Sequence, residues 1–227
     1  MNLKEKLKEY LFPMFPKEEV NDTCIEDYCV ATFQIEKNQI HWLFNSIYVN
    51  KDSFRKKDLA KKKYRDVLII LESPGTSEIE NPNNGPAVGK SGRIINNYFF
   101  YHLSSFLNFD FVKGEDTNLR SLVDKYVGKY NLWFINTIQY NTKYNNKSYF
   151  DDLIKIPEFQ TDFEERLKRH KPFIVINACT ANSKSLINDL ILKAYQHHDF
   201  LLLNTYHPSS GDTWCPFFDY RLFEEEE

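Results

Sequence analysis

The chain has few cysteines, and none of them lies in a metal-binding spacing. The four are Cys24, Cys29, Cys179 and Cys215, and no Cys-x-x-Cys pair occurs. Zinc sites and iron–sulfur clusters need closely spaced thiolates, so the sequence argues against both. We therefore expect no metal and no other cofactor. We interpret the cysteines as the reduced thiols of a cytosolic protein.

Long apolar runs and a strong charge of one sign are also missing. No stretch approaches the roughly 20 apolar residues that span a bilayer, and Met1 to Glu9 are charged and polar rather than signal-like. We expect a cytoplasmic monomer with no membrane contact. The net charge of -3 argues mildly against a strong nonspecific binder of nucleic acid. Basic residues cluster at 55–57 and 61–63. We interpret this cluster either as a solvated helix face or as a contact with phosphate groups.

The chain does have enough apolar sequence for one globular domain. It is 42% hydrophobic and 16% aromatic over 227 residues, which is typical of a packed core rather than a disordered chain. The spacing predicts a helix over 2–12, mostly helix over 24–48, and a basic helix or linker over 51–65. We therefore interpret residues 1–227 as one domain with a helical N-terminal extension at about 1–65.

Short apolar runs then alternate with amphipathic stretches. The runs predict strands over 66–72, 131–137, 173–177 and 200–205, and the amphipathic stretches predict helices over about 91–107, 158–170 and 181–195. Such alternation is typical of parallel strands joined by right-handed crossovers. The expected fold class is α/β, with a four-stranded parallel sheet flanked by helices on both faces.

Polar side chains follow three of these strands. Glu72 ends the first strand and enters a Ser-Pro-Gly turn, Asn136 ends the second, and His207 follows the fourth. Singly, each is an ordinary loop residue, a turn residue or a cap. Together they suggest a site, because open α/β sheets bind ligands at the carboxyl ends of their strands.

Three blocks carrying these residues resemble motifs of the uracil-DNA glycosylase superfamily, most closely its bacterial and archaeal iron–sulfur branch. The blocks are LESPG with the later GPAVGKSG, FINTIQYN and NTYHPSS. The family motifs read G-E-A-P-G with G-x-P-F-V-G-x-A-G, then T-N-V-V-K, then T-Y-H-P-S-A. The segment KPFIVINACTANSKSL is similar as well, so the resemblance covers about 66–100 and 130–212. It implies a uracil-DNA glycosylase-like fold and a monofunctional enzyme that removes uracil or a related damaged or modified base from DNA.

The resemblance also implies residue roles. Ionised Glu72 would stabilise an oxocarbenium-like sugar and orient the attacking water. His207 would donate a hydrogen bond to the departing base, and Asn136 would read the edge of a base flipped out of the stack. Further residues implied to bind the base are Ser73, Pro74, Gly75 and Ala87. Those implied to contact the DNA backbone are Gly89, Ser91, Ser209 and Ser210.

The chain departs from the family pattern at several points. Leu71 stands where the family has glycine, and Ala87 stands where it has a stacking phenylalanine. We expect a wider pocket for a larger or modified base, or a substitute ring from Tyr140 or Tyr144. The cluster cysteines are absent. Trp214 is either a wedge that fills the emptied base stack or a buried aromatic.

Other functions remain open on the sequence alone. The segment GPAVGKS resembles a phosphate-binding loop, but it has three residues between its glycines instead of four and lies far from the preceding strand. Another Glu–His hydrolase, acting on nucleosides or small glycosides, is a second alternative. A noncatalytic sensor of nucleic acid or nucleotides on the same fold is the third, because fold alone does not establish function.

Overall fold

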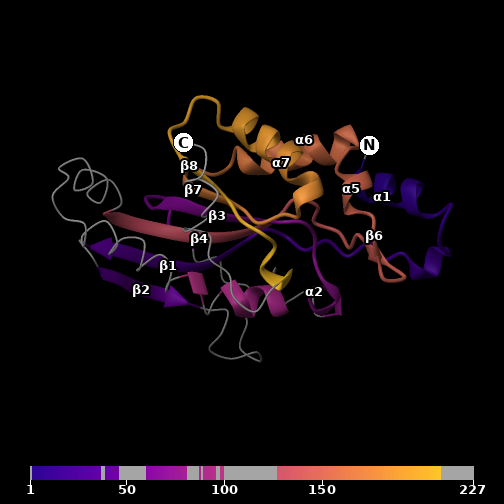
Figure 1. The fold of residues 1–227 in the computed structure, drawn as a ribbon, viewed down its shortest axis with the longest axis horizontal. Coiled ribbons are helices and arrows are strands. Elements are labelled where there is room, and N and C mark those ends of the chain that lie inside the picture. Colours follow the sequence, from indigo (N-terminus) through magenta and orange to yellow (C-terminus); the bar gives the residue numbers. More distant parts are fainter. Residues whose placement is uncertain are drawn as a thin grey trace, which may run out of the picture.

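The protein is an α/β structure built on a six-stranded mixed sheet (Figure 1). The computed structural model describes residues 2–36, 39–45, 60–80, 87, 89–95, 98–99 and 127–210. The strand order is β2-β1-β4-β3-β7-β8. The strands are β1 (Tyr28–Glu36), β2 (Gln39–Asn45), β3 (Arg65–Leu71), β4 (Gly128–Asn136), β7 (Pro172–Asn177) and β8 (Leu201–Asn204).

The four strands expected from the sequence are present and parallel to one another, in the order β4-β3-β7-β8. Their register aligns their carboxyl ends: Leu71 lies opposite Asn136, and Asn177 lies opposite both Ile70 and Asn204. Side chains that follow these strands are therefore delivered to one edge of the sheet.

The expected four-stranded, all-parallel sheet is nevertheless wrong, because two more strands join it antiparallel. β1 pairs with β4, and β2 pairs with β1. The prediction of mostly helix over 24–48, and of a helical extension over 1–65, is wrong for the same reason. Residues 29–33 of β1 are all buried, as expected for a strand that is covered on both faces inside a sheet, and this continuous burial gives no strand period in the sequence. Residues 51–59 of the expected basic helix or linker lie outside the described part.

The expected helices over 2–12, 158–170 and 181–195 are confirmed as α1 (Leu3–Leu11), α6 (Pro157–Leu167) and α7 (Ala181–Ala194). Of the helix expected over 91–107, residues 90–95 and 98–99 are helical and the rest lies outside the described residues. The shorter elements are η1 (Lys17–Glu19), α2 (Thr76–Glu80), β5 (Lys143–Tyr144), β6 (Lys147–Ser148), α5 (Phe150–Leu153) and η4 (Pro208–Ser210).

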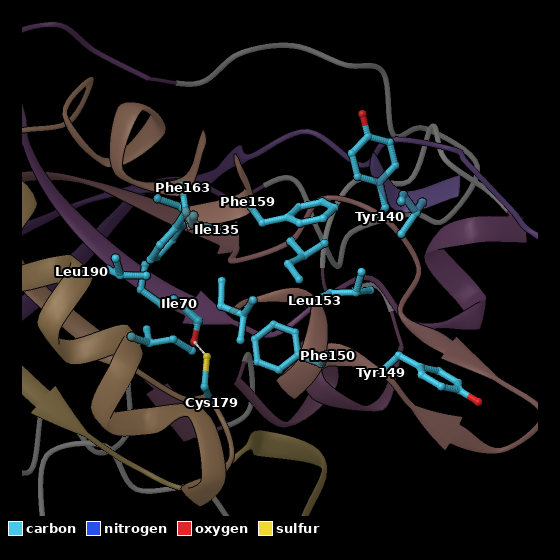
Figure 2. Packing of buried hydrophobic residues seen from close by; sticks show 14 of the residues in the cluster. Ile70, Ile135, Tyr140, Tyr149, Phe150, Leu153, Phe159, Phe163, Cys179 and Leu190 are labelled. Carbon is cyan, nitrogen blue, oxygen red and sulfur yellow. Dashed lines mark hydrogen bonds between the residues drawn. The ribbon is translucent and has the colours of Figure 1, made fainter. Parts of the chain in front are cut away.

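Apolar side chains pack on both faces of the sheet. On one face, Val67 and Ile69 of β3 belong to a cluster with Phe99 from the helical residues. On the other face, Ile70 packs with residues of α5, α6 and α7, among them Phe163 (Figure 2). Strand β3 is buried on both faces, so its sequence is a continuous apolar run rather than an alternating one.

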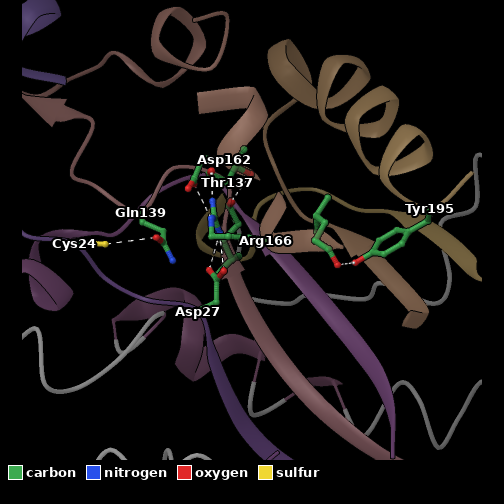
Figure 3. A network of polar contacts seen from close by, with 9 residues as sticks. Cys24, Asp27, Thr137, Gln139, Asp162, Arg166 and Tyr195 are labelled. Carbon is green, nitrogen blue, oxygen red and sulfur yellow. Dashed lines mark hydrogen bonds and ion pairs between the residues drawn. The ribbon is translucent and has the colours of Figure 1, made fainter. Parts of the chain in front are cut away.

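A buried arginine connects distant parts of the chain (Figure 3). Nη1 of Arg166 donates to both carboxylate oxygens of Asp27 at 2.9 and 2.7 Å, and Nε donates to Asp162 at 2.8 Å. Nη2 donates to the backbone oxygen of Thr137 at 2.8 Å. The guanidinium thereby joins the segment before β1, helix α6 and the residue that follows β4.

Two properties expected from the sequence concern cysteines and membranes. Cys24, Cys29 and Cys179 are free thiols, and Cys215 lies outside the described residues. Burial raises the pKa of the Cys179 thiol, with a further contribution from the charge of Glu72, so this thiol is protonated at neutral pH. Within the described part of the chain, no helix is long and apolar enough to cross a membrane.

Candidate active site

A cavity of about 570 Å³ opens at the carboxyl edge of the parallel strands. Its size is within the range of small-molecule sites in proteins. Every site residue expected from the sequence lines it, so the structure brings all of them together. They are Glu72, Ser73, Pro74, Gly75, Ala87, Gly89, Ser91, Asn136, His207, Ser209 and Ser210. We refer to this cavity as the first cavity.

The carboxylate of Glu72 is held by the backbone of a neighbouring loop. Oε1 of Glu72 accepts a hydrogen bond from the N–H of Thr180 at 2.9 Å. Thr180 is the N-cap of α7, so the carboxylate lies at the end of the helix where its dipole favours negative charge. The backbone oxygen of Glu72 also accepts from the N–H of Ile138 at 2.9 Å. The position of the acid is thus set by two different strand-end loops.

The hydrogen bonds of His207 determine its tautomer. The backbone N–H of Ser209 lies 3.3 Å from Nδ1 of His207, and the Ser209 hydroxyl lies 2.8 Å from the same nitrogen. A backbone N–H can only donate, so Nδ1 is the acceptor and the ring proton lies on Nε2. Burial lowers the pKa of His207, and the charge of Glu72 opposes that shift. The ring is therefore neutral at physiological pH, with Nε2–H as its donor.

Asn136 presents a buried donor without an acceptor. Asn136 is 2% exposed and lines the first cavity, and its Nδ2 has no hydrogen-bond partner among the described residues. An unpaired buried polar group costs about 1–3 kcal/mol, and most such groups in proteins are satisfied. A ligand with an acceptor atom, such as the carbonyl oxygen of a nucleobase, would satisfy it.

Glu78 lines the same cavity and was not expected from the sequence. Its side chain is 5% exposed, and Oε1 accepts a hydrogen bond from the N–H of Gly89 at 3.1 Å. A Cβ at Gly75 would lie 2.8 Å from Oε2 of Glu78, so a larger residue at this position would have to displace the carboxylate. Glu78 thereby connects α2 to Gly89, which directly precedes the helical residues 90–95. Sequence reasoning missed Glu78 because α2, the short helix that carries it, was not expected.

The cavity wall at Ala87 has no aromatic ring from Tyr140 or Tyr144, although the sequence suggests both as substitutes. Ala87 has φ of 58°, and it is buried in the cluster that contains Phe99. Tyr140 and Tyr144 belong to the cluster on the opposite face and do not line the first cavity, so the expectation that one of them supplies a ring is wrong. Among the described lining residues there is no Phe, Tyr or Trp. Trp214 lies outside the described residues.

A small hairpin, formed by β5 and β6, provides one wall that the sequence did not reveal. Asn145 and Asn146 have φ of 49° and 62° and form its turn, as asparagine does more readily than most residues. Lys143 and Asn146 line the cavity. The hydroxyls of Ser73 and Thr142 lie 2.7 Å apart, so the hairpin base is tied to the turn after β3.

A larger cavity of about 730 Å³ lies between α6 and the start of β3, and none of the expected site residues lines it. Its buried charges are already paired. Arg166 has the partners described above, and Asp66 accepts hydrogen bonds from Asn131, Trp133 and the N–H of Lys171. Although burial opposes it, the nearby His170 and the bonds from Asn131 and Lys171 lower the pKa of Asp66. The first cavity is the better candidate for a functional site, because an unpaired buried donor, an acid and an imidazole all line it.

Within the described residues, no group of three or more His, Cys, Asp or Glu side chains is arranged to hold a metal ion. The groups of the first cavity that could act on a ligand include the carboxylate of Glu72, the neutral imidazole of His207 and the amide of Asn136, and Glu78, Lys90 and Lys143 also line it. No protein-family model, curated protein or solved structure matches this chain.

Proposed function

We propose that this chain is a DNA glycosylase that hydrolyses the N-glycosidic bond of uracil or of a related damaged or modified base. The resemblance of its strand-end motifs to the uracil-DNA glycosylase superfamily suggests this reaction. The observation that supports it best is the unpaired buried Nδ2 of Asn136 in the same cavity as Glu72 and His207. A buried amide donor fits the carbonyl of a nucleobase, while the acid and the imidazole fit the cleavage of its bond to the sugar.

The proposed reaction breaks the bond between the base nitrogen and C1′ of the sugar, and the bonding electrons leave with the base. Nε2–H of His207 donates a hydrogen bond to the base oxygen on which negative charge develops. Ionised Glu72 stabilises the positive charge on the sugar and orients a water molecule. The water oxygen then bonds to C1′, and the released proton neutralises the base anion.

The proposed substrates include bases that are larger than uracil or chemically modified. Ala87 leaves the described wall without a stacking ring, and the first cavity is about 570 Å³. The base reaches this site by leaving the DNA stack. Gly89, Ser91, Ser209 and Ser210 line the cavity and are proposed to contact the DNA backbone.

A noncatalytic sensor of nucleic acid or nucleotides is the second candidate function. The observation in its favour is the same missing ring at Ala87, together with Leu71 in place of glycine on the wall of the cavity. A sensor would bind a base through Asn136 without needing either Glu72 or the neutral His207. The two functions are therefore separated by whether these side chains matter for product formation.

The deciding experiment is strand cleavage at abasic sites after alkali treatment. Oligonucleotides, single- and double-stranded, would carry uracil, hypoxanthine, xanthine, hydroxymethyluracil or an undamaged base. We expect cleavage with at least one of them and a loss of about 10²–10⁴-fold in Glu72→Gln, the usual range for a general acid–base group. The control is Glu165→Gln on the exposed side of α6. Binding without cleavage of any substrate would favour the sensor, and equal cleavage by both variants would remove Glu72 from the site.

A further inference from the structure

A second cavity, also of about 570 Å³, adjoins the first. The two share Thr180, His207 and Ser210, so the imidazole forms part of both walls. The remaining residues of the second cavity come from the first turns of α7 and from the end of β8. They are Ala181, Lys184, Ser185, Asn188, Asn204 and Tyr206.

The second cavity contains an unsatisfied buried polar atom of its own. Oδ1 of Asn204, the last residue of β8, is buried and has no hydrogen-bond partner within the described part of the chain. Asn177 at the end of the neighbouring β7 is different: its Nδ2 donates to Asn188 and its Oδ1 accepts from the N–H of Cys179. A donor from a bound molecule, such as the N–H group of a nucleobase edge, would satisfy Asn204.

Tyr206 gives the second cavity an aromatic wall. Tyr206 is 41% exposed and lines this cavity. It immediately precedes His207 in the chain. Exposed rings in nucleic-acid sites serve as platforms on which bases stack. Because Tyr206 and His207 are consecutive residues, a base lying on Tyr206 would be next to the group held in the first cavity.

We propose that the second cavity binds the nucleobase adjacent to the excised one on the same strand. The inference rests on the proposed function, since it takes the first cavity as the site of the target base. Tyr206 stacks on the neighbouring base, and Asn204 accepts a hydrogen bond from its edge. The substrate class that follows is single-stranded or locally unpaired DNA. In a duplex the neighbouring base remains stacked and paired, and therefore does not enter a cavity in the protein.

The charge of the region agrees with this mode of binding. Lys184 is the only lysine or arginine among the described residues that line the second cavity, and its ammonium group donates to the backbone oxygen of Thr205. Binding through phosphates would need several cations and would fall steeply with salt. Recognition here depends on a ring and an amide, so we expect its salt dependence to be weak.

The test measures binding by fluorescence anisotropy, with a labelled 12-nucleotide oligothymidylate that holds one central uracil. Glu72→Gln is the background, so that the probe is not consumed. We expect the single strand to bind at least about 10-fold more tightly than its duplex. Adding Tyr206→Ala should weaken single-strand binding by about 5- to 150-fold, the range for loss of one stacked base. Tyr206→Phe should restore it, and Leu192→Ala, which removes an exposed side chain elsewhere on α7, should leave it unchanged.

A second set of probes identifies the neighbouring base. A tetrahydrofuran abasic unit replaces the base on either side of the uracil. On one side of the uracil, this replacement should weaken binding as much as Tyr206→Ala does. Combining the replacement with Tyr206→Ala should not weaken binding further. The inference is overturned if the losses multiply on both sides, if duplex and single strand bind equally, or if the Phe and Ala variants bind alike. Absence of binding to every probe also overturns it.

The inference and the proposed function fail in different ways. Excision is measured on the same oligonucleotides with Glu72 intact. Excision that is insensitive to Tyr206 and to the neighbouring base would reject only the second subsite. Binding that depends on Tyr206 without any excision would reject only the glycosylase and retain a single-strand binding site.

Discussion

The carboxylate of Glu72 accepts a hydrogen bond from the backbone N–H of Thr180, so the acid after one strand is oriented by the loop after another. Thr180 has φ of -68°, which is the value that proline requires. Thr180→Pro would therefore remove the N–H at a compatible φ. A hydrogen bond to a charged group contributes about 1.5–3 kcal/mol, so we expect roughly a 10- to 150-fold fall in the excision rate.

The matched control for this change is Thr180→Ala, which keeps the N–H and loses only the side chain. The hydroxyl of Thr180 makes no capping hydrogen bond to α7, so little else should change. Rates come from single-turnover excision, and circular dichroism checks the fold. Equal rates for the Pro and Ala variants would show that the Thr180 N–H does not contribute to catalysis.

The titration of His207 is predicted to lie on the acid side of the usual histidine value of 6.5. Burial lowers its pKa and the charge of Glu72 raises it, so Glu72→Gln should move the midpoint further toward acid. Between the folded pKa and pH 6.5, the imidazole is therefore neutral in the folded protein, whereas it is protonated in the unfolded chain. Stability contributed by this difference is present above pH 6.5 and is lost as the pH falls toward the folded pKa. NMR of ¹⁵N-labelled histidine gives both the midpoint and the tautomer, and Nδ1 protonation at pH 7 would contradict the assignment.

Replacing Asn136 is predicted to abolish base binding without lowering the stability of the protein. The unpaired Nδ2 is unfavourable in the empty site, so Asn136→Leu should leave the free energy of unfolding unchanged or raise it by about 1 kcal/mol. The same change should abolish detectable base binding, because the donor is gone. Urea denaturation and oligonucleotide anisotropy measure the two effects. A clear loss of stability would mean that Asn136 has a structural partner in solution.

Arg166 is predicted to matter for folding rather than for chemistry. Arg166→Met leaves the largely buried Asp27 without its counter-charge, and breaking a buried ion pair from one side typically costs about 3–5 kcal/mol. Chemical denaturation should show this loss. Glu9→Gln breaks an exposed pair with Lys6 and should produce no measurable change. Similar midpoints for the two variants would show that the network contributes little.

Much of the parallel part of the fold could be predicted from the sequence, because β3, β4 and β7 are short apolar runs that are buried in the sheet. β1 and β2 could not be recognised in the same way. The apolar residues of 24–48 have a spacing that is ambiguous between helix and strand, and tertiary pairing with the edge of β4 decided the outcome. The expected boundaries of the predicted strands differ from the observed ones by a few residues at most.

The site was predictable for a related reason. Glu72, Asn136 and His207 follow parallel strands, and the carboxyl ends of such strands meet at one edge. The sequence could not reveal the N–H of Thr180, because every residue other than proline has one. It also gave no sign that Glu78 would fold back onto Gly89, or that the polar segment around Asn145 would form a hairpin wall.

The pairing of β1 with β4 has a consequence for any shortened form of the protein. A chain that began just before β3 would retain the four parallel strands and every expected site residue. It would also expose the full hydrogen-bonding edge of β4, a strand of nine residues. Unprotected edges of this kind recruit strands from other molecules and lead to aggregation. The described residues before β3 therefore protect this edge of the sheet, even though none of them lines either cavity at the carboxyl edge.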